Sequence, residues 1–262
     1  MRKENPIGVF DSGSGGISVL HSFRRMMPQE DFFYFGDHIN MPYGEKSPDE
    51  IRALTINACD AMADLGIKAL VIACNSASTA ALDRLLARYQ FPVLGIEPAV
   101  AKAAALPGKG LLLVMATTAT LASLRFKTLA SPFEDRVTPL PCPGLVELIE
   151  AEDKSGQDAY LSHLFSSVPK EDVAALVLGC THYPLIKDKI AQAFQKTVPI
   201  IDGYERAAET LLSRLKNARL LNEPGQFGKV MINSSGGPET KARLERFLVD
   251  QLSLIQTNNP GD

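Results

Sequence analysis

The sequence "KALVIACNSAST", residues 68–79, is an apolar run that ends in a cysteine followed by small polar residues. A second segment, "AALVLGCTHYPL", residues 174–185, has the same design and ends in Cys180 where the first ends in Cys74. A short apolar run followed by polar residues at a helix start predicts a buried strand and then a helix. In open parallel sheets ligands bind outside the carboxyl ends of the strands, so both thiols are expected at a binding site.

The same order of elements extends over the whole chain. "NPIGVFDSGSGGISVLHSFRRMM", residues 5–27, predicts a strand, a glycine-rich turn and a helix, and the pattern restarts after Glu97 and Pro98. Near-continuous apolar strands that alternate with helices favour a parallel sheet covered on both faces. We therefore predict an α/β fold of two pseudo-symmetric domains, each with a mostly parallel central sheet flanked by helices. The active site is expected in the cleft between them.

The segment 47–66 carries a full set of helix signals. Ser47 and Glu50 can form a capping box, Pro48 suits the first turn, and Gly66 ends the helix. Spacing predicts a buried face, and the residues on it are Ile51, Leu54, Ala58, Met62 and Leu65. Cys59, inside this helix, is interpreted as a small buried hydrophobe.

Composition excludes several classes of protein. The 262 residues carry a net charge of -3 and have no basic run interleaved with aromatic residues, so we expect no nucleic-acid partner. No apolar stretch approaches the roughly 20 residues of a membrane span, and the N-terminus lacks the apolar run of a signal peptide. These features predict a cytoplasmic protein that does not bind membranes. The polar tail "QTNNPGD", residues 256–262, is expected to fray.

The four cysteines, at positions 59, 74, 142 and 180, lack the close spacing of a zinc site or a redox pair. We expect free thiols and no metal, because the cytosol is reducing. Two thiols that face each other across a cleft can invert a stereocentre with an acidic C–H, one removing a proton while the other delivers one. The alternative is a pair of buried structural cysteines that happen to follow strands.

Other polar residues lie near the same strand ends. "DSGSGG", residues 11–16, misses the dinucleotide fingerprint because Ser18 occupies the third glycine position, but its amides and Ser12 could bind a carboxylate. Asp11 could orient a thiol or a substrate ammonium, or could simply cap the following helix. His182, two residues after Cys180, is interpreted as a proton shuttle. Taken alone, Cys180 and His182 also fit a nucleophile and its base.

Together these segments resemble the glutamate racemases, a family of aspartate/glutamate racemases that interconvert L- and D-glutamate for bacterial peptidoglycan without a cofactor. The motifs that carry the resemblance are "GVFDSGSGG", "YFGDHINMPYG", "VIACNSAS", "GIEP", "CPGLVELIE" and "LGCTHYPL", in the family's order along the whole chain. The resemblance implies a first domain of residues 1–97 plus 207–262 and a second of residues 98–206. It also implies a homodimer that needs no cofactor.

The resemblance further implies roles for particular residues. Cys74 matches the base that acts on D-glutamate and Cys180 the base that acts on L-glutamate. Asp11, Asp37, Glu150 and His182 match positions that assist catalysis. The implied substrate contacts come from Asp11, Ser12, Tyr43, Gly44, Asn75, Ser76, Thr181 and His182. Ser76 stands where the family commonly has threonine, which keeps the hydroxyl.

Two alternatives stay open. An aspartate racemase would share the thiols but would need a site shorter by one methylene. A catalytically silent carboxylate-binding module would need neither Cys74 nor Cys180, so retention of both argues against it. A phosphate or nucleotide site at residues 11–16 lacks the P-loop lysine as well as the third glycine.

Overall fold

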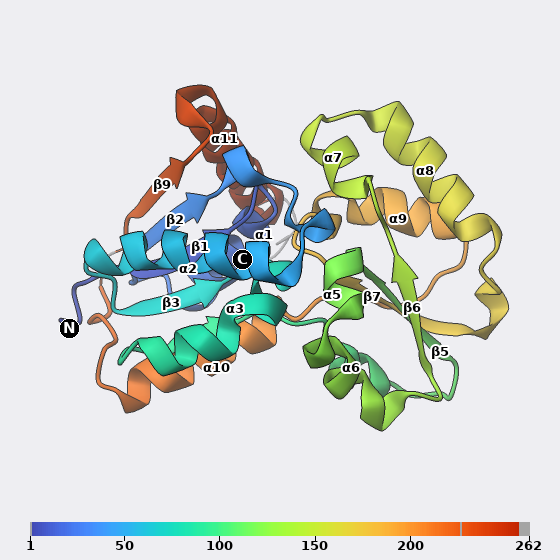
Figure 1. Ribbon diagram of the computed structural model, residues 1–262, viewed down its shortest axis with the longest axis horizontal. Coiled ribbons are helices and arrows are strands. Elements are labelled where there is room, and N and C mark those ends of the chain that lie inside the picture. The colour runs from blue at the N-terminus through green and yellow to red at the C-terminus, as the bar shows by residue number, and fades with distance from the viewer. Residues whose placement is uncertain (1, 226, 257–262) are drawn as a thin grey trace.

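The computed structural model describes residues 2–225 and 227–256, so most of the polar tail predicted to fray lies outside the described residues. Two parallel sheets form the centres of two halves that lie side by side (Figure 1). The five-stranded sheet has the order β4-β3-β1-β2-β9 and the four-stranded sheet the order β6-β5-β7-β8. The predicted α/β fold with parallel sheets is confirmed.

The five-stranded sheet belongs to the half that contains the N-terminus. Its strands are β1 (Ile7–Asp11), β2 (Phe32–Gly36), β3 (Ala69–Ile72), β4 (Val93–Gly95) and β9 (Val230–Ser234). β1 and β3 at its centre are wholly buried, as expected for apolar runs in a sheet that is covered on both faces. β9 pairs with β2, so the C-terminal part of the chain completes the first sheet.

The four-stranded sheet lies in the other half. Its strands are β5 (Leu111–Ala116), β6 (Val137–Pro141), β7 (Val173–Gly179) and β8 (Ile200–Ile201). β7 lies between β5 and β8 and is almost entirely buried. β3 and β7, the strands that precede the two thiols of interest, are therefore interior strands of their respective sheets.

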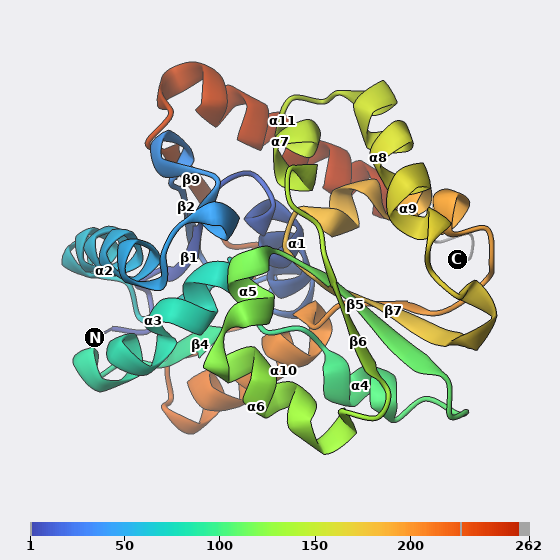
Figure 2. The same ribbon diagram turned by 45° about the vertical axis from the view of Figure 1, so that its right-hand side comes forward.

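Helices cover both sheets, as the turned view in Figure 2 shows. Those of the first half are α1 (Gly16–Met26), α2 (Pro48–Asp64), α3 (Asn75–Arg88), α10 (Tyr204–Asn217) and α11 (Gly237–Gln256). Those of the second half are α4 (Val100–Ala104), α5 (Thr118–Ala122), α6 (Leu124–Ala130), α7 (Leu145–Glu150), α8 (Lys154–Ser166) and α9 (Lys187–Phe194). Short 3-10 turns cover His38–Asn40, Tyr43–Glu45, Ser131–Phe133, Lys170–Asp172 and Tyr183–Ile186. The helix expected after the apolar run of residues 174–185 starts as the 3-10 turn Tyr183–Ile186 and becomes α9 at Lys187.

α2 shows how local sequence signals produce an element. Ser47 accepts a hydrogen bond from the Glu50 amide while the Glu50 carboxylate accepts one from the Ser47 amide, which is the predicted capping box. The predicted buried face is only partly right. Ile51 and Met62 are buried together with Cys59, but Leu65 is 65% exposed. Leu65, the C-cap, keeps a helical backbone conformation but lies to one side of the buried stripe of α2, which runs through Thr55 and Cys59.

The two halves have separate apolar cores. Tyr204, Ala208 and Leu211 of α10 pack with the first sheet, although the predicted boundary at residues 206 and 207 runs through this helix. The division into 1–97 plus 207–262 and 98–206 stays a prediction.

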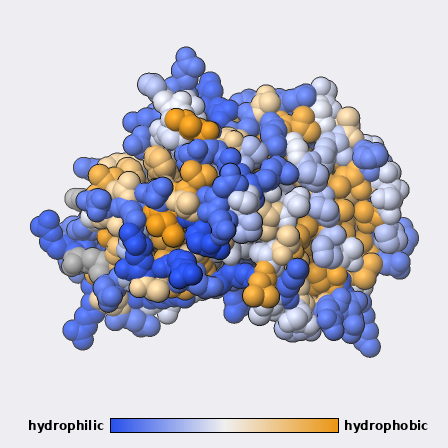
Figure 3. All heavy atoms as spheres, viewed as in Figure 1, coloured by the Kyte–Doolittle hydropathy of each residue, from blue (hydrophilic) through white to orange (hydrophobic). Residues whose placement is uncertain are grey.

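In the described residues no helix is both long and apolar enough to cross a membrane. On the face seen in Figure 3, hydrophobic side chains form separate patches among hydrophilic ones.

Candidate active site

Cys74 follows β3 directly and is the N-cap of α3. Its Sγ accepts a hydrogen bond from the Ala77 amide at 3.5 Å and another from Ser12 Oγ at 3.3 Å. Ser12 itself follows the last residue of β1, the neighbouring strand. The thiol is therefore held at the carboxyl edge of the first sheet, at the positive end of a helix of 14 residues.

Cys180 holds the corresponding place after β7 in the second sheet. Its Sγ lies 3.9 Å from Nδ1 of His182. The match with Cys74 is not complete, because the residues after Cys180 form a short 3-10 turn rather than a helix. The second thiol is therefore in contact with the imidazole of His182 rather than with the N-terminus of a helix.

The two thiols line one small cavity between the two halves. The predicted residues that share it are Ser12, Tyr43, Gly44, Asn75, Ser76, Thr181 and His182. Every residue predicted to contact substrate thus lies at this cavity, except Asp11. Cys74 and Cys180 are 5% and 6% exposed, so a small molecule bound there would be almost entirely enclosed.

Asp11 lies behind the cavity wall rather than in it. Its Oδ1 accepts a hydrogen bond from Thr181 Oγ1 at 3.2 Å, and its Oδ2 accepts one from the Gly13 amide at 3.0 Å. Complete burial raises the pKa of this carboxyl, against the lowering effect of nearby His182. The structure gives the contact with Cys74 to Ser12 and uses Asp11 to hold Thr181 of the other half.

Asp37 is a second carboxylate that lies one layer back. It follows β2 and accepts a 2.7 Å hydrogen bond from the hydroxyl of Tyr43, a residue that lines the cavity. Asn40 and Ser235 donate to the same carboxylate. Asp37 therefore positions Tyr43, and burial together with this hydrogen bond raises the pKa of the tyrosine.

Glu150, the last residue of α7, is paired with His182. Its Oε1 lies 2.7 Å from His182 Nε2, so the imidazole stands between the carboxylate and Cys180. Burial acts to lower the pKa of His182, but hydrogen bonds to Cys180 and Glu150 outweigh it, and the pKa lies well above its usual value. Burial likewise opposes the effect of His182 on Glu150, whose pKa is nevertheless lowered to about 2.

The two thiols differ in their surroundings. Burial, and after it the charge of Asp11, raises the pKa of Cys74 to about 12, so this thiol is protonated at neutral pH. Cys180 has a protonatable imidazole in contact instead. One sulfur is therefore suited to hold a proton while the other has a partner that can take or return one.

Cys59 and Cys142 are also free thiols. Cys59 is fully buried in the core between α2 and the first sheet, as its position inside the helix predicts. Cys142 lies in the core of the second half and donates a hydrogen bond to the carbonyl of Leu140 at 3.3 Å. Neither is among the described residues that line the cavity.

Sequence reasoning missed three residues of the cavity wall: Pro42, Thr117 and Val146. Thr117 is the most informative, because it follows β5 and its Oγ1 lies 2.8 Å from Ser76 Oγ across the two halves. The signal was present, since Thr117 sits between an apolar strand and a helix start and caps α5 through the Thr120 amide.

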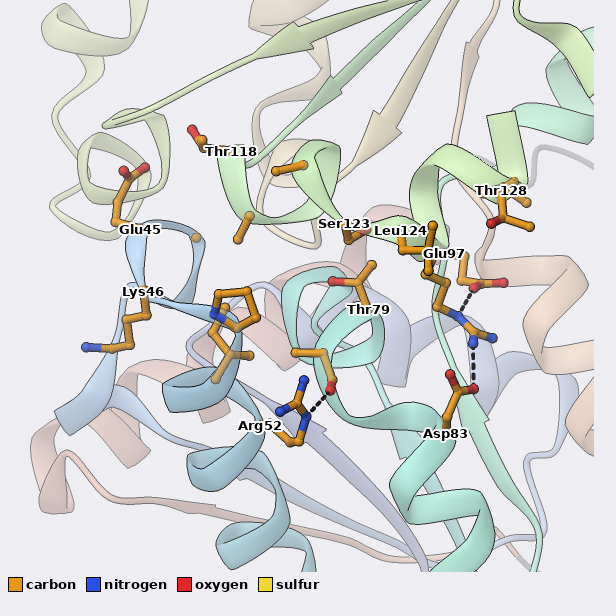
Figure 4. A pocket seen from close by; sticks show the side chains of 18 residues that line it. Glu45, Lys46, Arg52, Thr79, Asp83, Glu97, Thr118, Ser123, Leu124 and Thr128 are labelled. Carbon is orange, nitrogen blue, oxygen red and sulfur yellow. Dashed lines mark hydrogen bonds and ion pairs between the residues drawn. The ribbon is translucent and has the colours of Figure 1, made fainter. Parts of the chain in front are cut away.

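A more spacious groove adjoins the cavity (Figure 4). It is bordered by the first turn of α2, by α3, and by α5 and α6 of the other half, and it contains neither thiol. Gly44 lines both hollows. A Cβ at Gly44 would lie 2.7 Å from Thr117 Cγ2, so these two residues meet closely where groove and cavity join.

Comparison with known proteins agrees with this geometry. The family described as Asp/Glu/hydantoin racemase matches residues 7–211. A glutamate racemase from Clostridium acetobutylicum is 47% identical over 253 residues, which cover 95% of this chain and 98% of that protein. Among solved structures, a glutamate racemase isoform from Bacillus anthracis superposes with a TM-score of 0.84 at 30% identity, covering 94% of this chain and 95% of that one.

A glutamate racemase from Francisella tularensis, solved in complex with D-glutamate, superposes with a TM-score of 0.81 at 30% identity over 95% of this chain and 94% of that one. Paired parallel sheets with a thiol at an inner strand end of each, together with these relatives, identify the chain as an α/β racemase. The chain belongs to the Asp/Glu/hydantoin racemase family, in which it falls among the glutamate racemases.

Proposed function

We propose that the chain interconverts L- and D-glutamate by proton transfer between Cys74 and Cys180, without a cofactor. The observation that supports this most strongly is the enclosure of both thiols in one small cavity, each supplied by a different sheet. Binding of a carboxylate alone would require neither sulfur. The glutamate racemases that match nearly the whole chain support glutamate as the substrate.

In the proposed reaction the α-carbon of glutamate lies between the two sulfurs. For L-glutamate, the Cys180 thiolate takes the α-proton, and the electron pair of the C–H bond is delocalised into the α-carboxylate. The thiol of Cys74 then delivers its proton to the opposite face, which yields D-glutamate. The roles reverse for D-glutamate, and the two sulfurs have exchanged their protonation states after each turnover.

The surroundings of each sulfur suit these roles. The raised pKa of Cys74 keeps a proton available for delivery. His182 can hold a proton at Nδ1 for Cys180, and Glu150 fixes the other ring nitrogen. Asp11, through Thr181, and Asp37, through Tyr43, act on the cavity indirectly. The proposed assisting groups are therefore Asp11, Asp37, Glu150 and His182.

Substrate binding is assigned to short polar side chains and amides of the wall. Ser12, Asn75 and Ser76 lie at the first sheet, and Thr181 lies at the second. Hydroxyl and amide donors that are fixed before binding can stabilise the charge that develops on the carboxylate during proton abstraction. Tyr43 also lines the cavity, and Gly44 lies where the cavity meets the groove because it lines both.

Exchange with heavy water tests the chemistry. Incubation of either glutamate enantiomer in deuterated buffer, without pyridoxal phosphate or added metal, should place deuterium at the α-carbon of the product, read by proton NMR. A product that retains its original α-proton throughout would rule out the two-thiol mechanism. The control is the same incubation with alanine, whose side chain offers no second carboxylate.

The wider role follows from the same proposal. D-glutamate supplied in this way would serve peptidoglycan synthesis in a bacterial cytoplasm, and we infer a homodimer. The glutamate racemases that match the chain are bacterial proteins, which supports the bacterial setting of this proposal. Sedimentation of the purified chain tests the dimer, and rescue of a D-glutamate auxotroph tests the role.

A further inference from the structure

An arginine of the C-terminal helix, in the first half, contacts Glu150 of the second half. Arg243 lies on α11, whose Leu244 and Leu248 pack into the core of the first half. Its Nη2 donates to Glu150 Oε2 at 2.5 Å, and its Nη1 donates to the main-chain carbonyl of Glu150 at 2.9 Å. The arginine therefore donates hydrogen bonds both to the side chain of Glu150 and to the last main-chain carbonyl of α7.

Glu150 belongs to the second half, so this contact crosses between the two. Ile149 and Leu145 of α7 pack in the core of the second sheet. Ser14, in the turn just before α1 in the first half, makes two further contacts of the same kind. Its amide donates to Oε1 at 2.7 Å and its hydroxyl donates to Oε2 at 3.0 Å.

These contacts use the whole hydrogen-bonding capacity of the carboxylate. Oε1 accepts from the Ser14 amide and contacts His182 Nε2, while Oε2 accepts from Ser14 Oγ and Arg243 Nη2. A carboxylate has about four lone-pair sites, so Glu150 is held in one orientation. The side chain of Glu150 is 8% exposed, and a rotation would leave buried donors without an acceptor.

We propose that Arg243 is a positioning residue for proton transfer at Cys180. By fixing Glu150, it holds the His182 ring with Nε2 on the carboxylate and Nδ1 toward the sulfur. Arg243 and Ser14 come from the first half, and His182 and Glu150 come from the second, so the arrangement is complete only when the halves are together. This inference rests on the proposed function for its kinetic consequence, but its geometric part does not.

The network reaches only one of the two thiols. Cys74 is in contact with Ser12 and the Ala77 amide and has no shared partner with Arg243. Loss of the arginine should therefore slow proton transfer at Cys180 more than at Cys74. That asymmetry separates a positioning role from a general loss of structure.

The test uses Arg243→Gln and Arg243→Lys, with Arg246→Gln as the matched control. Arg246 is an exposed arginine on the same helix, so the control makes the same change of charge away from Glu150. We expect Arg243→Gln to lower kcat about 10- to 100-fold, the range for a misplaced catalytic group. KM should stay within about twofold, because Arg243 is not among the described residues that line the cavity.

Arg243→Lys keeps the charge but cannot reach the side chain and the carbonyl with one planar fork, so its kcat should lie between those of the native chain and Arg243→Gln. Primary isotope effects measured with α-deuterated substrates should rise for the enantiomer whose proton Cys180 removes, and should fall for the other. Isotope effects that change in the same direction for both enantiomers would overturn the proposal. So would a kcat within about twofold of the native value.

A measurement without substrate separates this inference from the proposed function. The ¹⁵N chemical shifts of the His182 imidazole should change in Arg243→Gln and stay unchanged in Arg246→Gln. Unchanged shifts in Arg243→Gln would overturn the positioning role, whatever the native chain catalyses. A native chain that shows the shift difference but does not racemise glutamate would instead contradict the proposed function alone.

Discussion

His182 Nε2 lies 2.7 Å from Glu150 Oε1, and both side chains are nearly inaccessible to solvent, at 3% and 8% exposed. The imidazole thereby has one nitrogen committed to a carboxylate and the other directed at the sulfur of Cys180. The pKa of His182 is raised well above its usual value and that of Glu150 is lowered to about 2. The pair therefore links stability to pH as well as supporting the proposed chemistry.

Glu150→Gln should destabilise the protein most in a defined pH window. A carboxyl with a depressed pKa stabilises the fold above its usual value of 4.5, and this contribution is lost as the pH falls through about 2. A histidine with a raised pKa contributes fully below 6.5, and this contribution is lost as the pH rises through the folded value. The drop in Tm should thus be largest between pH 4.5 and pH 6.5.

Thermal melts of Glu150→Gln from acid to alkaline pH measure this window. Glu147→Gln is the control, because Glu147 lies on the same helix and is exposed. A Tm difference between Glu150→Gln and the native chain that does not vary with pH would contradict the assignment of a charged pair. The same would follow from an equal effect of Glu147→Gln.

Cys74→Ala and Cys180→Ala should each abolish racemisation, with a loss of at least about 10²- to 10⁴-fold, the usual contribution of a general acid or base. The measurement is turnover from each enantiomer. Cys59→Ala removes a buried thiol that is not among the described residues that line the cavity, and it should retain activity, with a stability loss of about 1 kcal/mol. Normal turnover in either of the first two variants would remove the basis for the mechanism.

Thr117→Val should weaken substrate binding, because it breaks the 2.8 Å contact with Ser76 Oγ that joins α3 to the start of α5. Loss of one such hydrogen bond costs about 1 kcal/mol, or roughly a fivefold rise in KM. Thr117→Ser keeps the hydroxyl and should behave like the native chain. Equal KM values for Thr117→Val and Thr117→Ser would show that the contact has no part in binding.

Asp37→Asn should raise KM more than it lowers kcat, since Asp37 acts on the cavity through the hydroxyl of Tyr43. Tyr43→Phe removes the same hydrogen bond from the other side. Steady-state kinetics of the two single variants and the double variant measure their coupling. If the hydrogen bond is the shared cause, the effects of the two single changes should not add.

Much of this arrangement could be predicted from local sequence. Ser47 and Glu50 lie three residues apart, a spacing that predicts the start of α2. The apolar runs before Cys74 and Cys180 predict two buried strands. Because the carboxyl ends of parallel strands meet at one edge, residues that follow the strands could also be expected near the thiols. Ser12, Asn75 and Thr181 lie there for this reason.

Contacts between the halves could not be predicted in the same way. Arg243 lies 93 residues from Glu150 in the sequence, and no periodicity connects them. For the same reason the sequence could not show that Asp11 reaches the cavity through Thr181 rather than directly. The outward position of Leu65 was missed because the apolar spacing did not show that the buried stripe of α2 runs through Thr55 and Cys59.

A circular-dichroism assay of the purified chain tests the central claim most directly. L-glutamate, D-glutamate, L-aspartate and D-aspartate are each followed in buffer that contains a metal chelator and no pyridoxal phosphate. We predict that the signals of both glutamate enantiomers decay to zero, while those of the aspartates decay far more slowly. The contrary result would be glutamate signals that stay constant and decay only after pyridoxal phosphate or a metal ion is added. That result would contradict cofactor-independent racemisation by Cys74 and Cys180.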